Sequence, residues 1–385
     1  MDVHDLNSDI LSTIPQSIIE SILMLMPIKD AVKTSILSRK WRYCWTTMPM
    51  LAFDDHMVKV EASNHGKGLK KYKLVNAILN VLFQHKGLEL QFHYYGEMGF
   101  EFDQIILYLS NSKKLMKLFG PQNTSNNFYR LPSSFFSLQG LETLFLSNCN
   151  VVTPSTFNGF SKLEHLYLHH FEITSKSLRR LLSNCPLLKH ISLSGGYKED
   201  FAEENKFTFA ELIECVPLIR TLDISQSHMK YLAMGGMPQE LPTSLVYLKC
   251  LLLDVCQRNK DEISSTLSLM RNSPNLEVIN FKIYEVLHDG HISINQLDFH
   301  DYSGFNLDHL KTFTLSCYTH SALQFEFVKL VLAKAPMLRE AYIELDANVS
   351  IDKEARILRD MIRLPFARAS SSAELIIARP DPNEC

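Results

Sequence analysis

The N-terminal part of the fold is decided by residues 9–45, which read D-I-L-S-T-I-P-Q-S-I-I-E-S-I-L-M-L-M-P-I-K-D-A-V-K-T-S-I-L-S-R-K-W-R-Y-C-W. Pro15 suits the first turn of a helix, because the N–H that proline lacks has no partner there. Apolar residues then recur at helical spacing and give this helix one broad apolar face. These residues are Ile18, Ile19, Ile22, Leu23 and Met26. Pro27 cannot continue the helix, so the sequence predicts that it ends there.

Two more helices are expected in the same stretch. Asp30 is placed to start the second one, near the positive end of its dipole. Ser38 is a natural N-cap for a third, short helix that carries Trp41 and Trp45. A unit of about 45 residues buries only part of its apolar surface. The sequence therefore predicts an uncovered patch of Ile, Leu, Met and Trp side chains.

Two surfaces could cover this patch: a second polypeptide, or the domain that follows in the same chain. Fully burying one such side chain contributes about 1.5–3 kcal/mol, so about four or five of them would anchor a stable interface. The spacing of the apolar residues does not distinguish these two alternatives.

Beyond this stretch the chain repeats a pattern close to L-x-x-L-x-L. The distance between successive starts ranges from 22 residues, between Leu141 and Leu163, to 34 residues, between Leu276 and Leu310. Leucine-rich repeats run about 20–29 residues, so the series is a leucine-rich array with insertions. The strands are expected to start at Leu115, Leu141, Leu163, Leu188, Ile219, Leu248, Leu276, Leu310 and Leu338.

A second signal recurs in register with the leucines. The apolar end of a helix is followed by a proline, and a strand starts two residues later. The four instances are Leu181, Pro186 and Leu188; Leu212, Pro217 and Ile219; Leu269, Pro274 and Leu276; and Val331, Pro336 and Leu338. One helix and one strand per unit predicts an α/β fold. It is an irregular leucine-rich-repeat solenoid, with parallel strands on one face and helices on the other.

The segment between the N-terminal helices and the first clear repeat reads as a degenerate repeat that caps the array. The apolar pattern predicts a helix over 72–85, a strand over 88–92 and a helix over 102–109. Residues 54–68 are polar and are expected to form a loop. The basic residues nearby are interpreted as solvated: Lys67, Lys70, Lys71 and Lys73.

Composition excludes several classes of protein. Hydrophobic residues make up 46% of the chain and charged residues 21%, as in ordinary globular proteins. The 39 basic and 42 acidic residues give a net charge of -3, which argues against a nucleic-acid or membrane-surface protein. No apolar run approaches the ~18 residues of a membrane span, and the N-terminus does not read as a signal peptide. The eight cysteines show no zinc spacing, so a reducing location in the cytoplasm and/or nucleus is expected.

Residues 9–45 resemble the F-box, the module that connects a substrate receptor to a cullin-type ubiquitin ligase through a small Skp-type adaptor. Ile14 and Cys44 stand where the family commonly has Leu, and both keep the apolar character. The matching residues are Asp9, Ser12, Ile14, Pro15, Met26, Pro27, Asp30, Ala31, Val32, Thr34, Ser35, Leu37, Ser38, Trp41, Arg42 and Trp45.

The resemblance extends along almost the whole chain. The runs L-P-S-S-F-F at 131–136, A-M-G-G at 233–236 and L-P at 241–242 resemble plant proteins that join an F-box, leucine-rich repeats and a C-terminal FBD segment. Residues 310–343, with R-A-S at 368–370 and A-E-L at 373–375, are similar to that FBD segment. This implies an F-box over 5–50, leucine-rich repeats with a degenerate cap over 51–307, and an FBD-like segment over 308–378.

The resemblance implies the substrate-recognition subunit of an SCF-type cullin ubiquitin ligase. Its F-box would bind the Skp-type adaptor on the cullin scaffold, and its repeats would hold an unknown target protein. Ubiquitin transfer would be catalysed in trans by proximity. The chain itself is therefore expected to be no enzyme, with no catalytic residue, metal or cofactor. The expected adaptor-binding residues are Ile14, Pro15, Ile18, Ile19, Ile22, Leu23, Met26, Pro27, Val32, Leu37, Ser38, Trp41 and Trp45.

Two other classes of function stay open at this point. An adaptor-bound scaffold that holds partners without ubiquitination would have the same sequence features. An enzyme is disfavoured, because the sequence lacks the P-loop, dinucleotide-binding, nucleophile-elbow and H-E-x-x-H motifs. His165, His169 and His170 cluster around one strand and are interpreted as surface histidines rather than metal ligands.

Target contacts are expected at the strand positions that are not leucine. A pocket for a small anionic ligand would need a dense group of Arg and Lys within the strands, and the sequence shows none there, so no cofactor is expected. The candidate contact residues are Glu142, Thr143, Phe145, Glu164, His165, Tyr167, Lys189, His190, Ser192, Arg220, Thr221 and Asp223.

Overall fold

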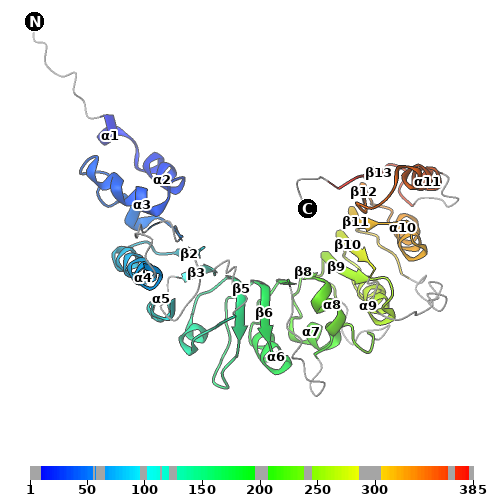
Figure 1. Cartoon of the computed structure of the whole chain (residues 1–385), viewed down its shortest axis with the longest axis horizontal. Coiled ribbons are helices and arrows are strands. Elements are labelled where there is room, and N and C mark those ends of the chain that lie inside the picture. Colours follow the sequence, from blue (N-terminus) through cyan, green and yellow to red (C-terminus); the bar gives the residue numbers. More distant parts are fainter. Residues whose placement is uncertain are drawn as a thin grey trace, which may run out of the picture. The chain divides into compact units, whose positions relative to one another are not determined.

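A computed structural model of the chain describes residues 10–54, 57, 66–95, 102–112, 115–120, 128–195, 207–237, 245–285, 305–362 and 369–380 (Figure 1). It comprises two compact units, Met1–Ser177 and Leu178–Cys385. The N-terminal helices and the first repeats therefore share unit 1. The family-like residues at 241–242 and at 368 lie outside the described residues.

Unit 1 begins with the predicted helices, which the structure confirms in part. Pro15 directly precedes α2, and Pro27 directly precedes α3 rather than closing α2. Asp30 lies in the first turn of α3, as expected. The elements are α1 (Ile10–Thr13), α2 (Gln16–Met24), α3 (Ile28–Lys33), η1 (Thr34–Ile36) and η2 (Cys44–Thr47).

The predicted third helix is wrong in type. Residues 39–43 form turns, and the short η2 that follows is a 3₁₀ helix. The Oγ1 of Thr46 donates to the main-chain oxygen of Tyr43, and the Oγ1 of Thr47 donates to that of Cys44. Threonine hydroxyls that bond to nearby carbonyls compete with helical hydrogen bonding. The Oγ of Ser38, expected to be an N-cap, has no hydrogen-bond partner among the described residues.

A parallel sheet follows in unit 1, with strand order β1-β2-β3-β5-β6 and with β4 paired to β5. Its strands alternate between buried and half-exposed residues, so one face packs on the core and the other is open. The strands are β1 (Met50–Phe53), β2 (Leu90–Tyr94), β3 (Leu115–Phe119), β4 (Tyr129–Arg130), β5 (Thr143–Val151) and β6 (His165–Ile173). The helices between them are α4 (Gly66–Gln84), α5 (Phe102–Ser110) and η4 (Ser133–Ser137). The helix, strand and helix predicted over 72–85, 88–92 and 102–109 are confirmed as α4, β2 and α5.

Among its described residues, unit 2 repeats the same design in seven parallel strands, β7 to β13 in that order. Figure 1 shows α7, α9 and α10 along one face of these strands. The strands are β7 (His190–Ser194), β8 (Thr221–Ile224), β9 (Cys250–Cys256), β10 (Val278–Tyr284), β11 (Thr312–Tyr318), β12 (Glu340–Leu345) and β13 (Glu374–Ala378). The helices are α6 (Ser175–Ser183), α7 (Phe209–Cys215), α8 (Gln226–Leu232), α9 (Lys260–Arg271), α10 (Ala322–Lys334) and α11 (Ile351–Ile362).

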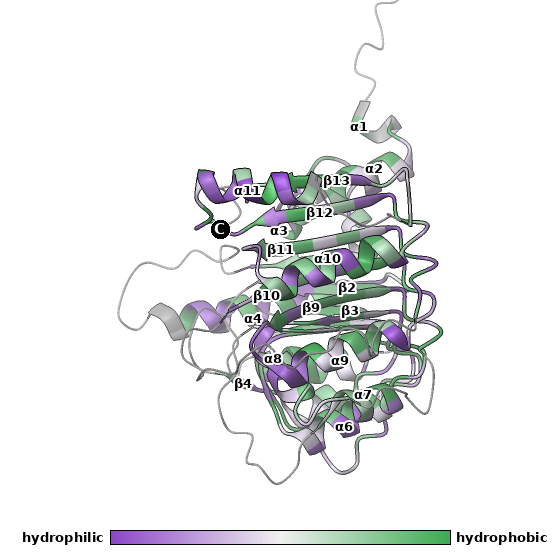
Figure 2. Cartoon of the chain, turned by 90° about the vertical axis from the view of Figure 1, so that its right-hand side faces the viewer, coloured by the Kyte–Doolittle hydropathy of each residue, from purple (hydrophilic) through white to green (hydrophobic). Residues whose placement is uncertain are grey.

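The predicted leucines form the core of this design. Leu188, Leu248 and Leu310 are each no more than 1% exposed and lie just before their strands. Figure 2 shows apolar segments, in green, along β11 and β12, and polar segments, in purple, on α11. The α/β leucine-rich fold is therefore confirmed, with each strand starting two residues after its predicted start, except β3, which starts at Leu115 as predicted.

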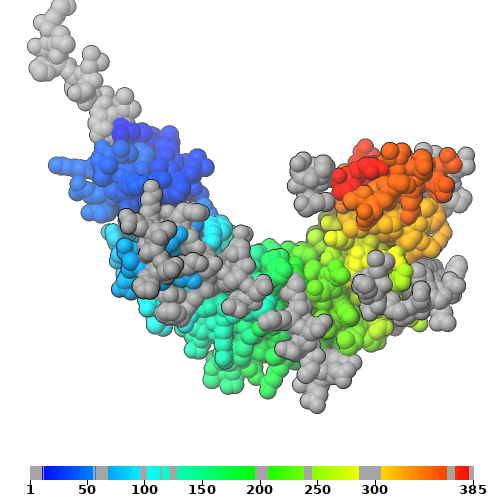
Figure 3. Space-filling model, viewed as in Figure 1, coloured from blue at the N-terminus to red at the C-terminus, as the bar shows by residue number. Residues whose placement is uncertain are grey.

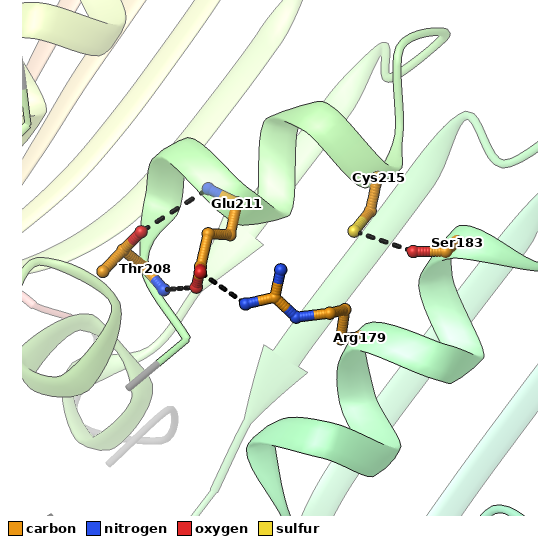
Figure 4. A network of polar contacts seen from close by, with 5 residues as sticks. All are labelled: Arg179, Ser183, Thr208, Glu211 and Cys215. Atoms are coloured by element: carbon orange, nitrogen blue, oxygen red, sulfur yellow. Dashed lines mark hydrogen bonds and ion pairs between the residues drawn. The ribbon is translucent and has the colours of Figure 1, made fainter. Parts of the chain in front are cut away.

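Side chains at the helix starts also join neighbouring repeats (Figure 4). Thr208 and Glu211 form a capping box at the start of α7: Glu211 N donates to Thr208 Oγ1, and Thr208 N donates to Glu211 Oε2. The same Glu211 carboxylate pairs with Arg179 of α6. Ser183 Oγ lies 3.1 Å from Cys215 Sγ, which links the far ends of these two helices.

Candidate functional site

The candidate site is built on α2 and α3, which both start directly after a proline. The oxygen of Pro15 accepts from the main-chain N–H groups of Ile18 and Ile19, each at 3.1 Å. The oxygen of Pro27 accepts from Asp30 and Ala31 in the same way. Each proline has an extended backbone, which its fixed φ favours, so the chain turns sharply into the helix that follows.

The inner side of these helices is a small apolar core. Ile19 and Leu23 are 0% exposed, and Trp41 and Trp45 are 3% and 4% exposed. The indole Nε1 of Trp41 donates to the main-chain oxygen of Leu11 at 2.9 Å. Four predicted adaptor-binding residues are therefore buried within this chain, and their inclusion in an uncovered patch is corrected. They are Ile19, Leu23, Trp41 and Trp45.

The outer side of α2 carries an apolar stripe. Ile18 is 49% exposed, Ile22 is 37% exposed and Leu25, the residue that caps the helix, is 88% exposed. Spacings of four and three residues place these three side chains on one face of the helix. We call Ile18, Ile22 and Leu25 the α2 stripe. Figure 3 shows this N-terminal part of unit 1 as the dark blue surface.

More apolar surface follows α3, where Ile36 is 87% exposed and Leu37 is 46% exposed. Sequence reasoning missed Leu25 and Ile36 as site residues, although Leu25 follows Ile18 by seven residues. The remaining predicted residues are exposed or half-buried: Ile14, Pro15, Met26, Pro27, Val32 and Ser38.

The end of the N-terminal segment is held by the first repeat of unit 1. Thr46 O accepts from Lys86 N at 2.7 Å, and Met48 O accepts from His85 Nε2 at 2.9 Å. The ammonium group of Lys86 lies 5.6 Å from the ring centroid of Tyr43. On the side of the N-terminal segment these contacts use only Tyr43, Thr46 and Met48, so they leave the α2 stripe uncovered.

The open face of the unit 1 sheet carries a row of aromatic rings, which we call the aromatic ladder. His93, Phe119, Phe145 and Tyr167 occupy paired positions on β2, β3, β5 and β6. The rings of His93 and Phe119 are stacked, with their centroids 4.1 Å apart. The centroids of Phe119 and Phe145 lie 6.2 Å apart, and so do those of Phe145 and Tyr167. Phe145 and Tyr167 were predicted as contact residues, whereas His93 and Phe119 were missed.

The open face of unit 2 is polar at the predicted positions. Ser192 Oγ donates to Asp223 Oδ2 at 2.7 Å, across β7 and β8. Asp254 on β9 accepts from the main-chain N–H of Gln226. Burial raises the pKa of Asp223 and of Asp254, because each carboxylate is partly removed from water. The other predicted residues lie at the first position of the same two strands or directly before it, and they are half-buried or exposed: Lys189, His190, Arg220 and Thr221.

The other predicted contact residues and histidines lie on the open face of unit 1. Glu142, Thr143, Glu164 and His165 are half-buried there. The rings of His169 and His170 meet edge to face at 4.3 Å. Within the described ranges, no three His, Cys, Asp or Glu side chains are grouped to hold a metal ion. The cysteines that the structure describes are all free thiols, and none of the described helices has the length and apolarity to cross a membrane.

Comparison with known proteins identifies both parts of this architecture. Residues 11–52 match the F-box domain, and residues 106–201 match the leucine-rich repeats of the FBD-associated F-box protein At5g56370. The chain is 28% identical to the F-box/FBD/LRR-repeat protein At1g13570 of Arabidopsis thaliana, over 96% of this chain and 98% of that protein. The resemblance to F-box/FBD/LRR-repeat proteins that the sequence indicated is thereby confirmed.

Two further relatives from the same plant match a part of their length. F-box/LRR-repeat protein 25 is 28% identical over 49% of this chain and 68% of its own length. The F-box/FBD/LRR-repeat protein At3g26920 is 26% identical over 48% of this chain and 42% of its own.

Proposed function

We propose that this chain, which carries an F-box followed by leucine-rich repeats, is the substrate-recognition subunit of an SCF-type cullin ubiquitin ligase. In this proposal a Skp-type adaptor covers the α2 stripe and connects the chain to the cullin scaffold. The repeats hold a target protein near the ubiquitin-charged enzyme. Ubiquitin transfer is then catalysed in trans, by the proximity of target and enzyme. The complex works in the cytoplasm or nucleus, where cysteines stay reduced.

The observation that carries this proposal is the exposure of the α2 stripe above a closed core. Ile18, Ile22 and Leu25 keep 37% to 88% of their surface in contact with solvent, while Ile19 and Leu23 beneath them are fully buried. Burying one such side chain completely contributes about 1.5–3 kcal/mol. A protein that covered all three, together with Ile36 and Leu37, would gain enough free energy for a stable complex.

Target recognition is proposed for the aromatic ladder. Aromatic side chains are enriched among the residues that dominate binding energy at protein interfaces. The ladder presents four half-buried rings on the open face of one rigid sheet, so little conformational entropy is lost when a partner binds.

The test is co-purification of the full chain with a Skp-type adaptor and a cullin after co-expression. We expect wild type to retain both proteins and Ile18→Ser/Ile22→Ser to lose them. The matched control is Ile351→Ser/Leu358→Ser, which changes two exposed apolar residues of α11 in unit 2. Equal retention by the α2 variant and wild type, with native tryptophan fluorescence in both, would reject adaptor docking at this surface.

A second candidate function is a non-proteolytic scaffold that binds the adaptor and a partner. The half-life of a captured partner separates the two functions. A ligase receptor shortens that half-life, and proteasome inhibition restores it. A scaffold leaves the half-life unchanged while both interactions persist.

A further inference from the structure

One edge of the unit 2 sheet carries a row of charged residues, each one position after the buried residue that opens its repeat. Main-chain hydrogen bonds hold the row in register: from the second residue of the row onward, each N–H donates to the main-chain oxygen of the row residue in the preceding repeat, at 2.7 or 2.8 Å. The strands are parallel, so all six positions lie at the same edge. We call this row the basic edge: Lys189, Arg220, Lys249, Glu277, Lys311 and Arg339.

Five of these six residues are cations, and the repeat fold does not require them to be. The corresponding positions of unit 1, one residue after Leu115, Leu141 and Leu163, hold Met116, Glu142 and Glu164. Those positions have the same kind of main-chain bonds, from Glu142 N to Met116 O and from Glu164 N to Glu142 O. The fold therefore accepts an apolar or acidic residue there, and the cations of unit 2 need another explanation.

The cations of the basic edge differ in whether they form an ion pair with a described residue. Glu277 accepts from both Lys249 and Lys311, each at 2.5 Å, and this pairing holds the pKa of its carboxyl at about 2. Arg220 and Arg339 are exposed, and neither makes an ion pair with a residue that the structure describes. These two guanidinium groups are available to a carboxylate from another molecule.

Exposed apolar side chains accompany the cations at the same edge. Leu187, Tyr247 and Met337 are 40%, 49% and 54% exposed. Each lies one residue before a buried leucine of the core, so it is two residues before Lys189, Lys249 and Arg339 respectively. In these three repeats the edge thus carries an exposed apolar side chain and a basic side chain two residues apart.

We infer that the basic edge binds an acidic, extended segment of the target protein that also carries apolar side chains. Its carboxylates pair with Arg220 and Arg339, and its apolar side chains contact the three exposed apolar residues. Arginine pairs with a carboxylate through two parallel hydrogen bonds, which fixes orientation as well as affinity. This inference rests on the proposed function, because it names the chemistry of the target that the repeats would hold.

The charges of this edge fit a peptide better than a polyphosphate or an anionic membrane. Glu277 lies within the row, and Glu340 and Glu374 lie at the starts of β12 and β13. A nucleic-acid backbone or a lipid surface presents anions throughout, so it would meet these carboxylates as well as the cations. A peptide can place neutral side chains opposite them.

The test uses the full chain bound to its adaptor and two labelled peptides, one of Glu-Glu-Leu repeats and one of Gln-Gln-Leu repeats. Fluorescence anisotropy should show binding of the acidic peptide alone, and binding should weaken as salt is added. Arg220→Glu/Arg339→Glu should bind the acidic peptide about tenfold more weakly, because two attractive contacts become repulsive. The matched control, Arg356→Glu/Arg359→Glu, makes the same change of charge on α11 and should bind like wild type.

Three results would overturn the inference. One is an equal loss in the α11 control, which would show a general effect of net charge. Another is unchanged binding by Arg220→Glu/Arg339→Glu. The third is that phosphatidylserine vesicles or a uridine oligonucleotide bind this edge more tightly than the peptide. Adaptor co-purification should be the same in every variant, so failure of this inference is distinct from failure of the proposed function.

Discussion

The indole N–H of Trp41 donates to the main-chain oxygen of Leu11, 2.9 Å away, and so ties the turn after η1 to α1. Trp41 is 3% exposed, whereas Ile18 and Ile22 on the neighbouring α2 are 49% and 37% exposed. The N-terminal segment thus separates its apolar residues into an inner set that holds the fold and an outer set that is open to a partner.

Replacing the inner tryptophan should destabilise unit 1. We expect Trp41→Ala to lower its free energy of unfolding by about 3–5 kcal/mol, because a large buried side chain is lost. Both tryptophans of the chain, Trp41 and Trp45, lie in unit 1, so the fluorescence of Trp45 in a urea titration reports on that unit alone. Ile36→Ala, at an 87% exposed position, should change the stability by less than ~0.5 kcal/mol. Equal stability of the two variants would contradict this assignment.

Glu262 should make the stability of unit 2 depend on pH. It is 1% exposed and accepts from Cys256 N and Asn259 Nδ2, yet burial raises its pKa to about 7. Between pH 4.5, the ordinary pKa of a glutamate, and about 7 the folded state binds more protons than the unfolded state. Stability is therefore lost as pH rises through this window, and it is fully present below it.

The variant Glu262→Gln removes this titration. Its free energy of unfolding, measured by circular dichroism in urea, should fall less between pH 5 and pH 8 than that of wild type. Glu214→Gln, at an exposed position on α7, should follow wild type. A pH dependence of Glu262→Gln equal to that of wild type would show that another group dominates.

Gln324 should be essential to the packing of α10. Its buried amide donates to the main-chain oxygens of Ile283 and Cys317, at 3.1 and 2.9 Å, and accepts from Thr319 N. Removing it takes a hydrogen-bond partner from three main-chain groups, and a buried group left unsatisfied costs about 1–3 kcal/mol. Gln324→Ala should therefore lower the stability of unit 2 by at least ~2 kcal/mol, measured by circular dichroism. A loss as small as that of Gln226→Ala, an exposed glutamine of α8, would contradict the role.

The aromatic ladder should affect target capture and leave adaptor binding intact. We expect Phe119→Ser/Phe145→Ser to capture fewer target proteins from cells in which the proteasome is blocked, while the adaptor co-purifies as with wild type. Proximity labelling compares the variant with wild type in the same way for target proteins that bind too weakly to be captured. An unchanged set of labelled proteins would exclude the ladder from target recognition.

The architecture could be predicted from the sequence because the positions of the leucines and the prolines indicate where strands and helices lie. A buried leucine or isoleucine lies two residues before each strand from β5 to β12, and prolines follow several of the helices, so these strand starts were predicted to within two residues. The sequence was weaker for β13, α8 and α11, which it did not predict. The residues of β13 lack the leucine spacing, and α8 is a short helix after Ser225, whose side chain makes no capping bond.

The sequence predicted most residues of the candidate site, but it did not predict which of them face the core and which face solvent. Ile18, Ile19, Ile22 and Leu23 share one apolar pattern, and the spacing alone did not show which pair faces the core. The two tryptophans are buried, and they lie in turns and a 3₁₀ helix where the sequence predicted an α-helix. The aromatic ladder depends on pairing between β2, β3 and β5, where a shift of register after Leu90 and the insertion of β4 conceal the match.

The most direct test of the central claim is calorimetric titration of the purified full chain with a Skp-type adaptor. We expect Ile18→Ser/Ile22→Ser to weaken the affinity about a hundredfold, since two apolar side chains of the interface are lost. Trp41→Phe, which removes an internal hydrogen bond and leaves the α2 stripe unchanged, should bind like wild type. If the serine variant keeps the wild-type affinity while its tryptophan fluorescence stays native, the α2 stripe is not the adaptor surface and the account is wrong.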